Sequence, residues 1–319
     1  MEYRFANTKE LTDKEFDGIL NLFNTVFSRS LTADELRSQY TSTEFGYSYH
    51  SFLMDNGVVI AHHAAFPSKY CVGEKEMLTF YTGSTMVDKQ YRDGFCFLEV
   101  VKKLTANMAQ RGYAFVFGFP NEQSYKVFGR IFKTKNIGKL KIYCLPYRIG
   151  GIKNALTILN PFSILFCGLW MWLHHFGGKK TVKTKLIHKN DDVFNLTRYK
   201  RLEQEYSHIN IDGLEFYYCV KLHEGVRTAF LIDVRQKSQY NFRKAIWYIF
   251  KHCRKDFDLI MYVGDLDEVG HIGLIRIPVR YEPKHFYVTG KILDKTVIED
   301  SVFYDIKNWD LNLSNYDII

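Results

Sequence analysis

The sequence lacks paired cysteines and clustered metal ligands. Its six cysteines, which include no C-x-x-C pair, stand at positions 71, 96, 144, 167, 219 and 253. The eleven histidines are not at ligand spacing from them. A structural zinc site needs such clusters, so we expect no bound metal. The N-terminus also lacks the basic-then-apolar pattern of a secretory signal, so we expect a cytoplasmic protein with reduced thiols.

Motifs for nucleic-acid binding are missing as well. The formal net charge is +8, and lysines cluster at 133–141 and at 179–189. Such charge suits nucleic acid, an anionic cofactor or a membrane surface, or it forms a solvated face. Since no helix-turn-helix, zinc-finger or ribonucleoprotein motif accompanies it, we expect no nucleic-acid partner.

The sequence has no long uninterrupted apolar run. Residues 154–176 are the most hydrophobic stretch, but Asn160 and Pro161 interrupt it. The remaining run is about a dozen residues, against the roughly 20 that a membrane span requires. We expect either a buried helix between two domains or a helix in a membrane interface, because Trp170, Trp172 and a lysine-rich segment follow one another there.

The amino-acid composition is ordinary for a soluble globular protein. Hydrophobic residues make up 46% of the 319 residues and charged residues 24%, with 16% aromatics. This length allows two domains, each with its own core. We expect one domain at 1–150, a hydrophobic helix with a basic linker at 151–189, and a second domain at 190–319.

Two helices are expected near the start of the chain. Thr12 and Glu15 have the spacing of a capping box, and so have Thr32 and Glu35. Apolar residues recur at helical spacing after Thr12, so one face of the first helix is expected to be buried. We expect both helices to precede the first strand.

A run of strands follows, and it leads into a long helix. Asn56-Gly57 lies between two apolar runs and predicts a β-hairpin. The segment 77–87 has the composition of a strand, and 97–111 has apolar residues at helical spacing. A strand-to-helix junction of this kind directs the N–H groups of the first helical turn at a possible anion. The segment 113–118 predicts a further strand, parallel to 77–87.

Another helix and strand complete this half. Asn121 is a good N-cap for a helix that carries Tyr125, and 137–145 predicts a strand. The order of elements predicts an α/β fold with a mixed sheet and helices on its faces.

This order, with the segments TMVDKQYRDGFCFLEVVKKL and YAFVFGFPNEQSYKVFGRI, resembles the GCN5-related N-acetyltransferase (GNAT) superfamily. It is similar to the bacterial branch of enhanced-intracellular-survival type, in which a complete domain precedes a degenerate copy. The resemblance implies an acyl-CoA N-acyltransferase fold with acetyl-CoA as co-substrate. It also implies that the second domain shapes the acceptor cleft.

The resemblance assigns cofactor contacts to the end of the strand and the turn after it. These residues are Met86, Val87, Arg92, Asp93, Gly94, Phe95, Cys96 and Phe97. A backbone N–H near Met86 or Val87 would stabilise the oxyanion. The family's turn is usually R-x-x-G-x-G/A, but here Phe95 and Phe97 occupy the glycine positions. Because side chains there compete with phosphate for space, either the loop is shifted so that Gly94 serves or the site has decayed.

The resemblance also suggests catalytic residues in the next helix. Tyr125 matches the tyrosine that protonates the departing thiolate, with Asn121 as its companion; alternatively, Tyr125 only packs the helix on the sheet. His62 and His63 lie on one strand and point to opposite faces, so at most one can act as a base in the acceptor groove.

These features predict an N-acyltransferase that acetylates a primary amine of a small molecule or amino sugar. Two alternatives remain open. One is a scaffold protein with this fold that no longer binds coenzyme A. The other is a peripheral membrane enzyme that acts on a lipid-linked amino sugar, with residues 154–189 at the membrane surface.

Overall fold

The computed structural model describes residues 1–319 except 93, 190–191, 200–204 and 316–319. The chain forms two compact units. Unit 1 comprises residues 1–138, 185–205 and 287–310, and unit 2 comprises 139–184, 206–286 and 311–319. This division differs from the expected boundaries at 150 and 190. The hydrophobic helix lies in unit 2, and a segment near the C-terminus belongs to unit 1.

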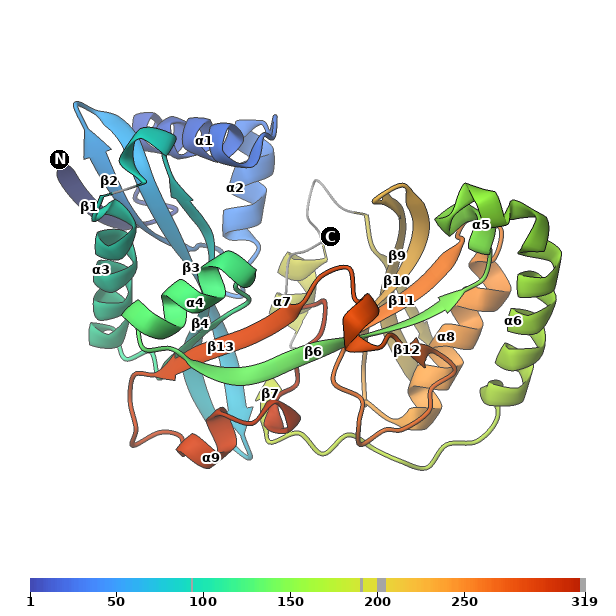
Figure 1. The fold of residues 1–319 in the computed structure, drawn as a ribbon. Helices are drawn as coiled ribbons and strands as arrows, with labels where there is room; N and C mark the ends of the chain where they lie inside the picture. Colours follow the sequence, from blue (N-terminus) through green and yellow to red (C-terminus); the bar gives the residue numbers. More distant parts are fainter. Residues whose placement is uncertain (93, 190–191, 200–204, 316–319) are drawn as a thin grey trace. The chain divides into compact units, whose positions relative to one another are not determined.

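Unit 1 is built around a mixed sheet in the order β1-β2-β3-β4-β5-β13, with β7 paired to β3 (Figure 1). Its strands are β1 (Glu2–Asn7), β2 (Tyr49–Asp55), β3 (Val58–Val72), β4 (Lys75–Val87), β5 (Phe115–Gly118), β7 (Leu186–His188) and β13 (Phe286–Ile292). The β4–β5 pair is parallel, as predicted, and the other pairs are antiparallel.

Helices cover both faces of this sheet. Those of unit 1 are α1 (Asp13–Phe27), α2 (Ala33–Thr41), α3 (Cys96–Gln110), α4 (Glu122–Ile131), α7 (Asp192–Arg198) and α9 (Asp300–Phe303), with 3₁₀ turns η1 (Lys89–Tyr91) and η4 (Ile306–Asn308). Phe16 of α1 and Leu36 of α2 share a core with Phe52 of the sheet. Val100 and Val101 of α3 share another core with Leu53, the next residue of the same strand. Since neighbouring strand residues point to opposite faces, α1 and α2 cover one face and α3 the other.

The predicted helix starts are confirmed. Thr12 and Thr32 each accept a hydrogen bond from the backbone N–H of a glutamate three residues later, and the glutamate carboxylate accepts one from the backbone N–H of the threonine. The predicted order of elements was wrong in one respect, because β1 precedes both helices and pairs with β2. Its six residues are too few for their alternation of polar and apolar side chains to predict a strand.

A segment far along the sequence completes the core of unit 1. Trp309 packs against Tyr70, Phe115 and Phe117, with ring centroids 5.2–5.5 Å apart. Its indole N–H donates to the carbonyl of Phe303, which also packs on Phe115. Residues 287–310 therefore pack in the core of unit 1, whereas the sequence placed this segment in the second domain.

Unit 2 has a sheet in the order β6-β11-β10-β9-β8, with β12 paired to β6. Its strands are β6 (Lys135–Pro146), which starts in unit 1, β8 (Ser207–Ile211), β9 (Leu214–His223), β10 (Val226–Val234), β11 (Leu259–Gly264) and β12 (Ile275–Arg276). Only the two residues of β12 pair after residue 274, and the 3₁₀ turn η3 (Val279–Tyr281) follows.

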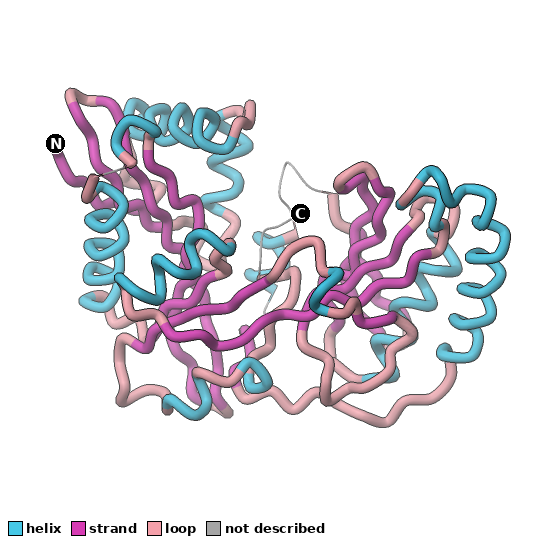
Figure 2. The backbone as a smooth tube through the Cα atoms, in the orientation of Figure 1, coloured by secondary structure: helices cyan, strands magenta, loops and turns pink. Residues whose placement is uncertain are grey.

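The helices of unit 2 pack on its sheet and on one another (Figure 2). They are α5 (Ile149–Ile152), α6 (Asn160–His175) and α8 (Gln239–Cys253), and the 3₁₀ turn η2 (Asn154–Leu159) precedes α6. Phe242, Ile246 and Ile249 of α8 share a core with Cys167 and Met171 of α6.

Candidate functional site

Strand β4 continues beyond its parallel neighbour. It pairs with β5 from Thr79, opposite Phe115, only as far as Thr82, opposite Gly118. On its other side it remains paired with β3 to Val87. Within the described chain, no strand therefore pairs with this edge of β4 over residues 83–87. An edge without a partner strand is suited to an extended ligand that pairs with it as a strand would.

A β-bulge lies in this part of β4. His62 is paired with Met86 and Ala64 with Gly83, so His63 stands opposite two residues, Ser84 and Thr85. Ser84 has a φ of 48°, in the left-handed region that non-glycine residues seldom adopt. A bulge bends its strand and re-aims the residues after it. It thus sets the direction of the open edge.

The two adjacent histidines hold both residues of the bulge. The Nδ1 atom of His62 lies 3.0 Å from the carbonyl oxygen of Ser84, and Nδ1 of His63 lies 2.8 Å from the hydroxyl of Thr85. The rings point to opposite faces, as predicted. His62 lies beside Tyr40 of α2, and His63 lies 6.3 Å from Phe128 of α4 between ring centroids.

A buried chain of hydrogen bonds extends from His62 to β1. Because a carbonyl only accepts, Nδ1 of His62 carries the proton and its Nε2 accepts from Nδ1 of His50, 3.0 Å away. The other nitrogen of His50, Nε2, lies 2.9 Å from the hydroxyl of Thr8, which also lies 3.1 Å from the carbonyl oxygen of Ser48. The link between the two rings requires a neutral His62, which the sequence alone did not reveal.

Burial keeps these histidines neutral. All three rings are fully buried. Burial lowers the pKa of His62 to about 4 and that of His63 to about 3, and it holds the pKa of His50 well below its ordinary value. His62 and His63 are therefore supports of the bulge, and neither is placed as a solvent-accessible base. The Nε2 atom of His63 has no hydrogen-bond partner among the described residues.

The turn after β4 is closed by short-range hydrogen bonds. Asp88 accepts from the backbone N–H of Gln90 at 2.9 Å, and the hydroxyl of Tyr91 donates to Asp55 at 2.8 Å. Arg92, which is exposed, donates from Nε to the carbonyl of Val87 at 3.2 Å. The guanidinium therefore lies against the end of β4. Asp93, another predicted cofactor contact, lies outside the described residues.

Helix α3 starts without a side-chain cap from the described residues. Phe95 occupies the N-cap position with its ring 81% exposed. Gly94 has no positive φ, and a Cβ there would meet only the Tyr91 carbonyl at 3.5 Å. The N–H groups of the first turn are thus left without an intrahelical partner. This arrangement is compatible with an anion at the helix start.

Phe97 lies away from the turn, contrary to what its position in the motif suggested. Its ring packs against Phe128 and Phe132 of α4, with centroids 5.8 and 5.4 Å apart. This contact fixes α4 on the first turn of α3. A side chain in that cluster cannot also occupy the space beside the turn.

Two other predicted cofactor residues have buried side chains. Met86 belongs to the core under α1 and α2, and Cys96 belongs to the core under α3. Burial also raises the pKa of the Cys96 thiol. Only the backbone of these two residues is suited to a ligand.

Tyr125 and Asn121 lie at the start of α4. Asn121 is the N-cap, as predicted, because its Oδ1 accepts from the backbone N–H of Ser124 at 2.8 Å. Asn121 thus has a structural role in starting the helix. The ring of Tyr125 is half-buried and packs on Tyr287 of β13, with centroids 4.6 Å apart. Tyr287, which comes from distant sequence, was not among the predicted site residues.

Unit 2 repeats the order of elements around this site. The hairpin β9-β10, helix α8 and parallel strand β11 follow one another like β3-β4, α3 and β5. Here, however, the helix start is occupied. Ser238 caps α8, and the N–H of Gln239 donates to the carbonyl of Lys180 at 2.7 Å. The backbone N–H of Val182 donates to the carbonyl of Lys237 at 2.9 Å. Residues 180–182 therefore fill the position that a ligand would take at the start of α8.

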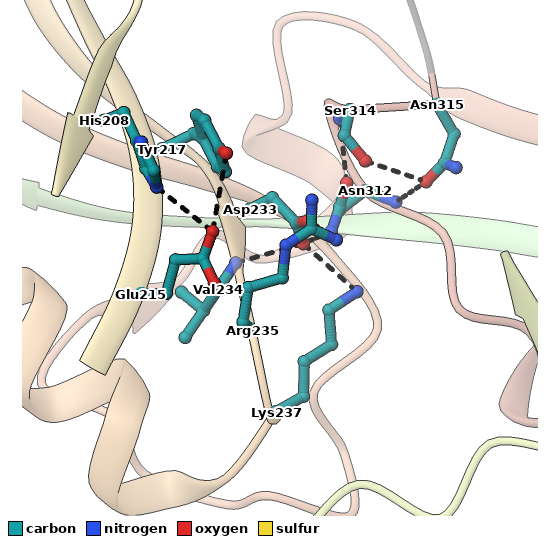
Figure 3. Close-up of polar contacts among 10 residues, drawn as sticks. All are labelled: His208, Glu215, Tyr217, Asp233, Val234, Arg235, Lys237, Asn312, Ser314 and Asn315. Carbon is teal, nitrogen blue, oxygen red and sulfur yellow. Dashed lines mark hydrogen bonds and ion pairs between the residues drawn. The ribbon is translucent and has the colours of Figure 1, made fainter. Parts of the chain in front are cut away.

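The charges beside this second helix start are also neutralised internally (Figure 3). Asp233, at the end of β10, forms ion pairs with Arg235 and Lys237 and accepts from Asn312 at 2.7 Å. Burial of Asp233 would raise its pKa, but the two cations outweigh it and lower the pKa. These side chains hold the C-terminal segment on unit 2.

Solved structures of acetyltransferases share this fold. The GCN5-related N-acetyltransferase of Anabaena variabilis superposes with a TM-score of 0.58 at 12% identity, over 91% of this chain and 73% of that one. The corresponding protein of Kribbella flavida has a TM-score of 0.59 at 10% identity, over 92% and 71%. Eis1 of Mycobacterium abscessus has a TM-score of 0.55 at 12% identity, over 92% and 74%. At such identities the likeness concerns the fold.

The amino-acid sequence gives a second indication of the kind of domain. Residues 7–131 match the family model described as an acetyltransferase (GNAT) domain. This range contains the bulged strand β4, the turn, α3 and α4. No curated protein matches the sequence significantly. Residues 7–131 therefore match the acetyltransferase (GNAT) domain that the resemblance implied.

Proposed function

We propose that the protein transfers an acetyl group from acetyl-CoA to a primary amine of a small molecule or amino sugar. The open edge of β4 at residues 83–87 carries the proposal. An extended ligand with amide groups can pair with such an edge as an added strand would. The pantetheine arm of coenzyme A has amide groups of this kind.

The adjoining turn supports the same ligand. The uncapped first turn of α3 offers N–H groups to a pyrophosphate, and Arg92 adds a positive charge beside it. The side chain of Phe97 leaves this space clear because it packs on α4. Phe95 remains at the motif position, with its ring in solvent. These features fit the coenzyme without a glycine at either position.

In this proposal the protein contributes positioning and proton transfer. Acetyl-CoA supplies an activated thioester carbonyl. A backbone N–H near Met86 or Val87 stabilises negative charge on the carbonyl oxygen, since the bulge fixes the edge in advance. The amine attacks the carbonyl carbon, the C–S bond breaks, and Tyr125 gives its hydroxyl proton to the departing sulfur. A phenol with a pKa of ~10 can protonate a thiolate whose conjugate acid has a pKa near ~8.5.

Calorimetric titration with acetyl-CoA tests the proposal. We expect one binding site per chain, because the corresponding helix start in unit 2 is filled by residues 180–182. The dissociation constant should lie in the range of about 1 μM to 1 mM that is usual for enzyme substrates. Absence of heat at millimolar ligand would contradict the enzyme proposal, and two equivalent sites would contradict the assignment to unit 1.

A pair of variants of the turn makes the titration specific. Arg92→Ala should weaken binding about tenfold, the usual effect of losing one charge-assisted hydrogen bond. Lys89→Ala is the matched control, because Lys89 is also an exposed cation of the same turn. Equal weakening in both would indicate a diffuse charge effect in place of a contact with Arg92.

A scaffold protein without coenzyme binding is the second candidate. Its support was the pair Phe95 and Phe97 at the glycine positions. The position of Phe97 in the aromatic cluster with α4 removes half of that support. The same titration separates the two candidates, because a scaffold of this kind would not bind acetyl-CoA.

A further inference from the structure

An apolar surface on unit 2 is not used by the site in unit 1. Helix α6 and the turn η2 before it carry a row of large exposed hydrophobic side chains at helical spacing. They are Ile158, Leu159, Phe162, Leu165, Phe166, Leu169, Trp172, Leu173 and Phe176. Phe162 is 72% exposed and Leu165 is 74% exposed. A contiguous row of this kind marks an interaction surface on a soluble protein.

The opposite face of the same helix is fastened to unit 2. Cys167 and Met171 are buried in its core. The indole N–H of Trp170 donates to the carbonyl of Gly273 at 2.9 Å, and the ring of His175 packs on Trp247 of α8 with centroids 4.6 Å apart. The helix therefore has one anchored side and one bare apolar side.

This attachment decides how the helix can meet a membrane. Asn154–His175 is the stretch of the described chain that is long and apolar enough to span a bilayer, and only 11% of its most apolar window is buried. A helix whose one side is bound to a folded unit along its length cannot be surrounded by lipid. It can, however, lie in the membrane plane with its bare side in the headgroup and acyl boundary.

The charge around the helix selects the kind of surface. No aspartate or glutamate occurs between Glu122 and Asp191. Within unit 2, exposed lysines stand at both ends of the apolar row, Lys153 before it and Lys179, Lys180 and Lys183 after it. Each lysine near an anionic bilayer adds attraction.

The same charges disfavour a second copy of the chain as the occupant. A two-fold contact places the same patch of both molecules face to face. It would therefore bring these lysines together with no acidic residue of the segment to offset them. An anionic lipid surface instead offers opposite charge at the flanks and hydrocarbon at the centre.

We propose that the exposed face of α6, with its flanking lysines, docks the protein in the plane of an anionic membrane surface. Cosedimentation of the full chain with vesicles tests this proposal. The probes are vesicles of phosphatidylcholine alone and of phosphatidylcholine with about one-quarter phosphatidylglycerol. We expect the wild type to pellet with the anionic vesicles and to remain largely in the supernatant with the neutral ones. Wild-type protein in the supernatant with both kinds, or equal binding to both, would overturn the proposal.

Apolar variants test the helix face directly. Leu165→Glu combined with Leu169→Glu should lower the partition onto anionic vesicles by about tenfold or more, because two leucines that would enter the bilayer are lost. Leu222→Glu is the matched control, since Leu222 is 69% exposed on β9 of the same unit. Equal loss in the control would overturn the assignment to α6.

Further measurements keep the proposal testable if the double leucine variant folds poorly. Lys179→Gln combined with Lys183→Gln changes only exposed side chains and should lower binding by about fivefold for each charge removed. Tryptophan fluorescence should shift to the blue on vesicle addition in the wild type and much less in Trp172→Phe. Light scattering that shows a dimer dissociated by the leucine changes, without vesicle binding, would assign the surface to a second copy and overturn the proposal.

Discussion

The Nδ1 atom of His50 lies 3.0 Å from the Nε2 atom of His62, and both rings are fully buried. This contact links the first strand pair to the bulge of β4, because His62 also holds the carbonyl of Ser84. The geometry of the open edge therefore depends on two neutral imidazoles that are far from solvent. Protonation of His62 at Nε2 would set an N–H group against the N–H of His50 and break this link.

The stability of the protein should fall as the pH falls below about 6.5, the pKa of an unfolded histidine. Burial lowers the pKa of His50, His62 and His63, so the unfolded state takes up more protons in the range between 6.5 and about 4. Each of these groups then costs about 1.4 kcal/mol of unfolding free energy per pH unit. Urea unfolding at pH 7.0, 6.0 and 5.0 measures the effect.

His63→Gln is the control for this pH dependence. It removes one titrating ring and should reduce the slope by the contribution of one group. An unchanged slope would show that other groups cause the acid sensitivity. A free energy of unfolding that stays constant from pH 7.0 to 5.0 in the wild type would contradict the prediction altogether.

Removing the hydroxyl of Tyr125 should slow turnover without weakening the binding of acetyl-CoA. Tyr125→Phe keeps the ring that packs on Tyr287 but removes the proposed proton donor. We expect kcat to fall about 10²-fold or more, as is usual for the loss of general acid catalysis. Steady-state kinetics and calorimetry provide the two measurements.

Tyr287→Phe is the matched control, because it changes the partner ring of the same aromatic pair. Its kcat should remain within about twofold of the wild type, since only the Tyr125 hydroxyl is proposed to react. Equal losses in the two variants would assign Tyr125 to packing alone and leave the thiolate to be protonated by water.

Replacing Phe95 by glycine should leave coenzyme binding unchanged or slightly tighter. The ring of Phe95 is exposed, and its φ of −80° does not require glycine. Phe97→Ala should behave differently, because it empties the cluster with Phe128 and Phe132 and should cost about 3 kcal/mol of stability. Titration and urea unfolding of both variants check this contrast. Weaker binding in Phe95→Gly would show that the ring itself contacts the ligand.

Trp309→Ala should destabilise the protein by about 3–5 kcal/mol, the range for a buried large aromatic residue. Its ring packs on Tyr70 and Phe117 inside unit 1, although it lies near the end of the sequence. For the same reason, a fragment that ends at residue 150 should not fold stably. Urea unfolding is the measurement, and Trp172→Ala, which removes an exposed indole, is the control with an expected change below about 0.5 kcal/mol.

Much of the local structure could be predicted from short stretches of sequence. The capping boxes placed α1 and α2, Asn56-Gly57 placed the β2–β3 hairpin, and Asn121 placed the start of α4. These features depend on hydrogen bonds between residues a few positions apart, so the nearby sequence contains both partners.

The sequence by itself therefore determined the helix starts, the hairpins and the acetyltransferase domain. Only the tertiary structure decided what supports the site. The pairing of His62 with Ser84, the direction of Phe97 and the packing of Trp309 join residues that are 22 or more positions apart or on different elements. Whether a side chain is buried, neutral or exposed depends on what covers it after folding, and that partner can come from anywhere in the chain.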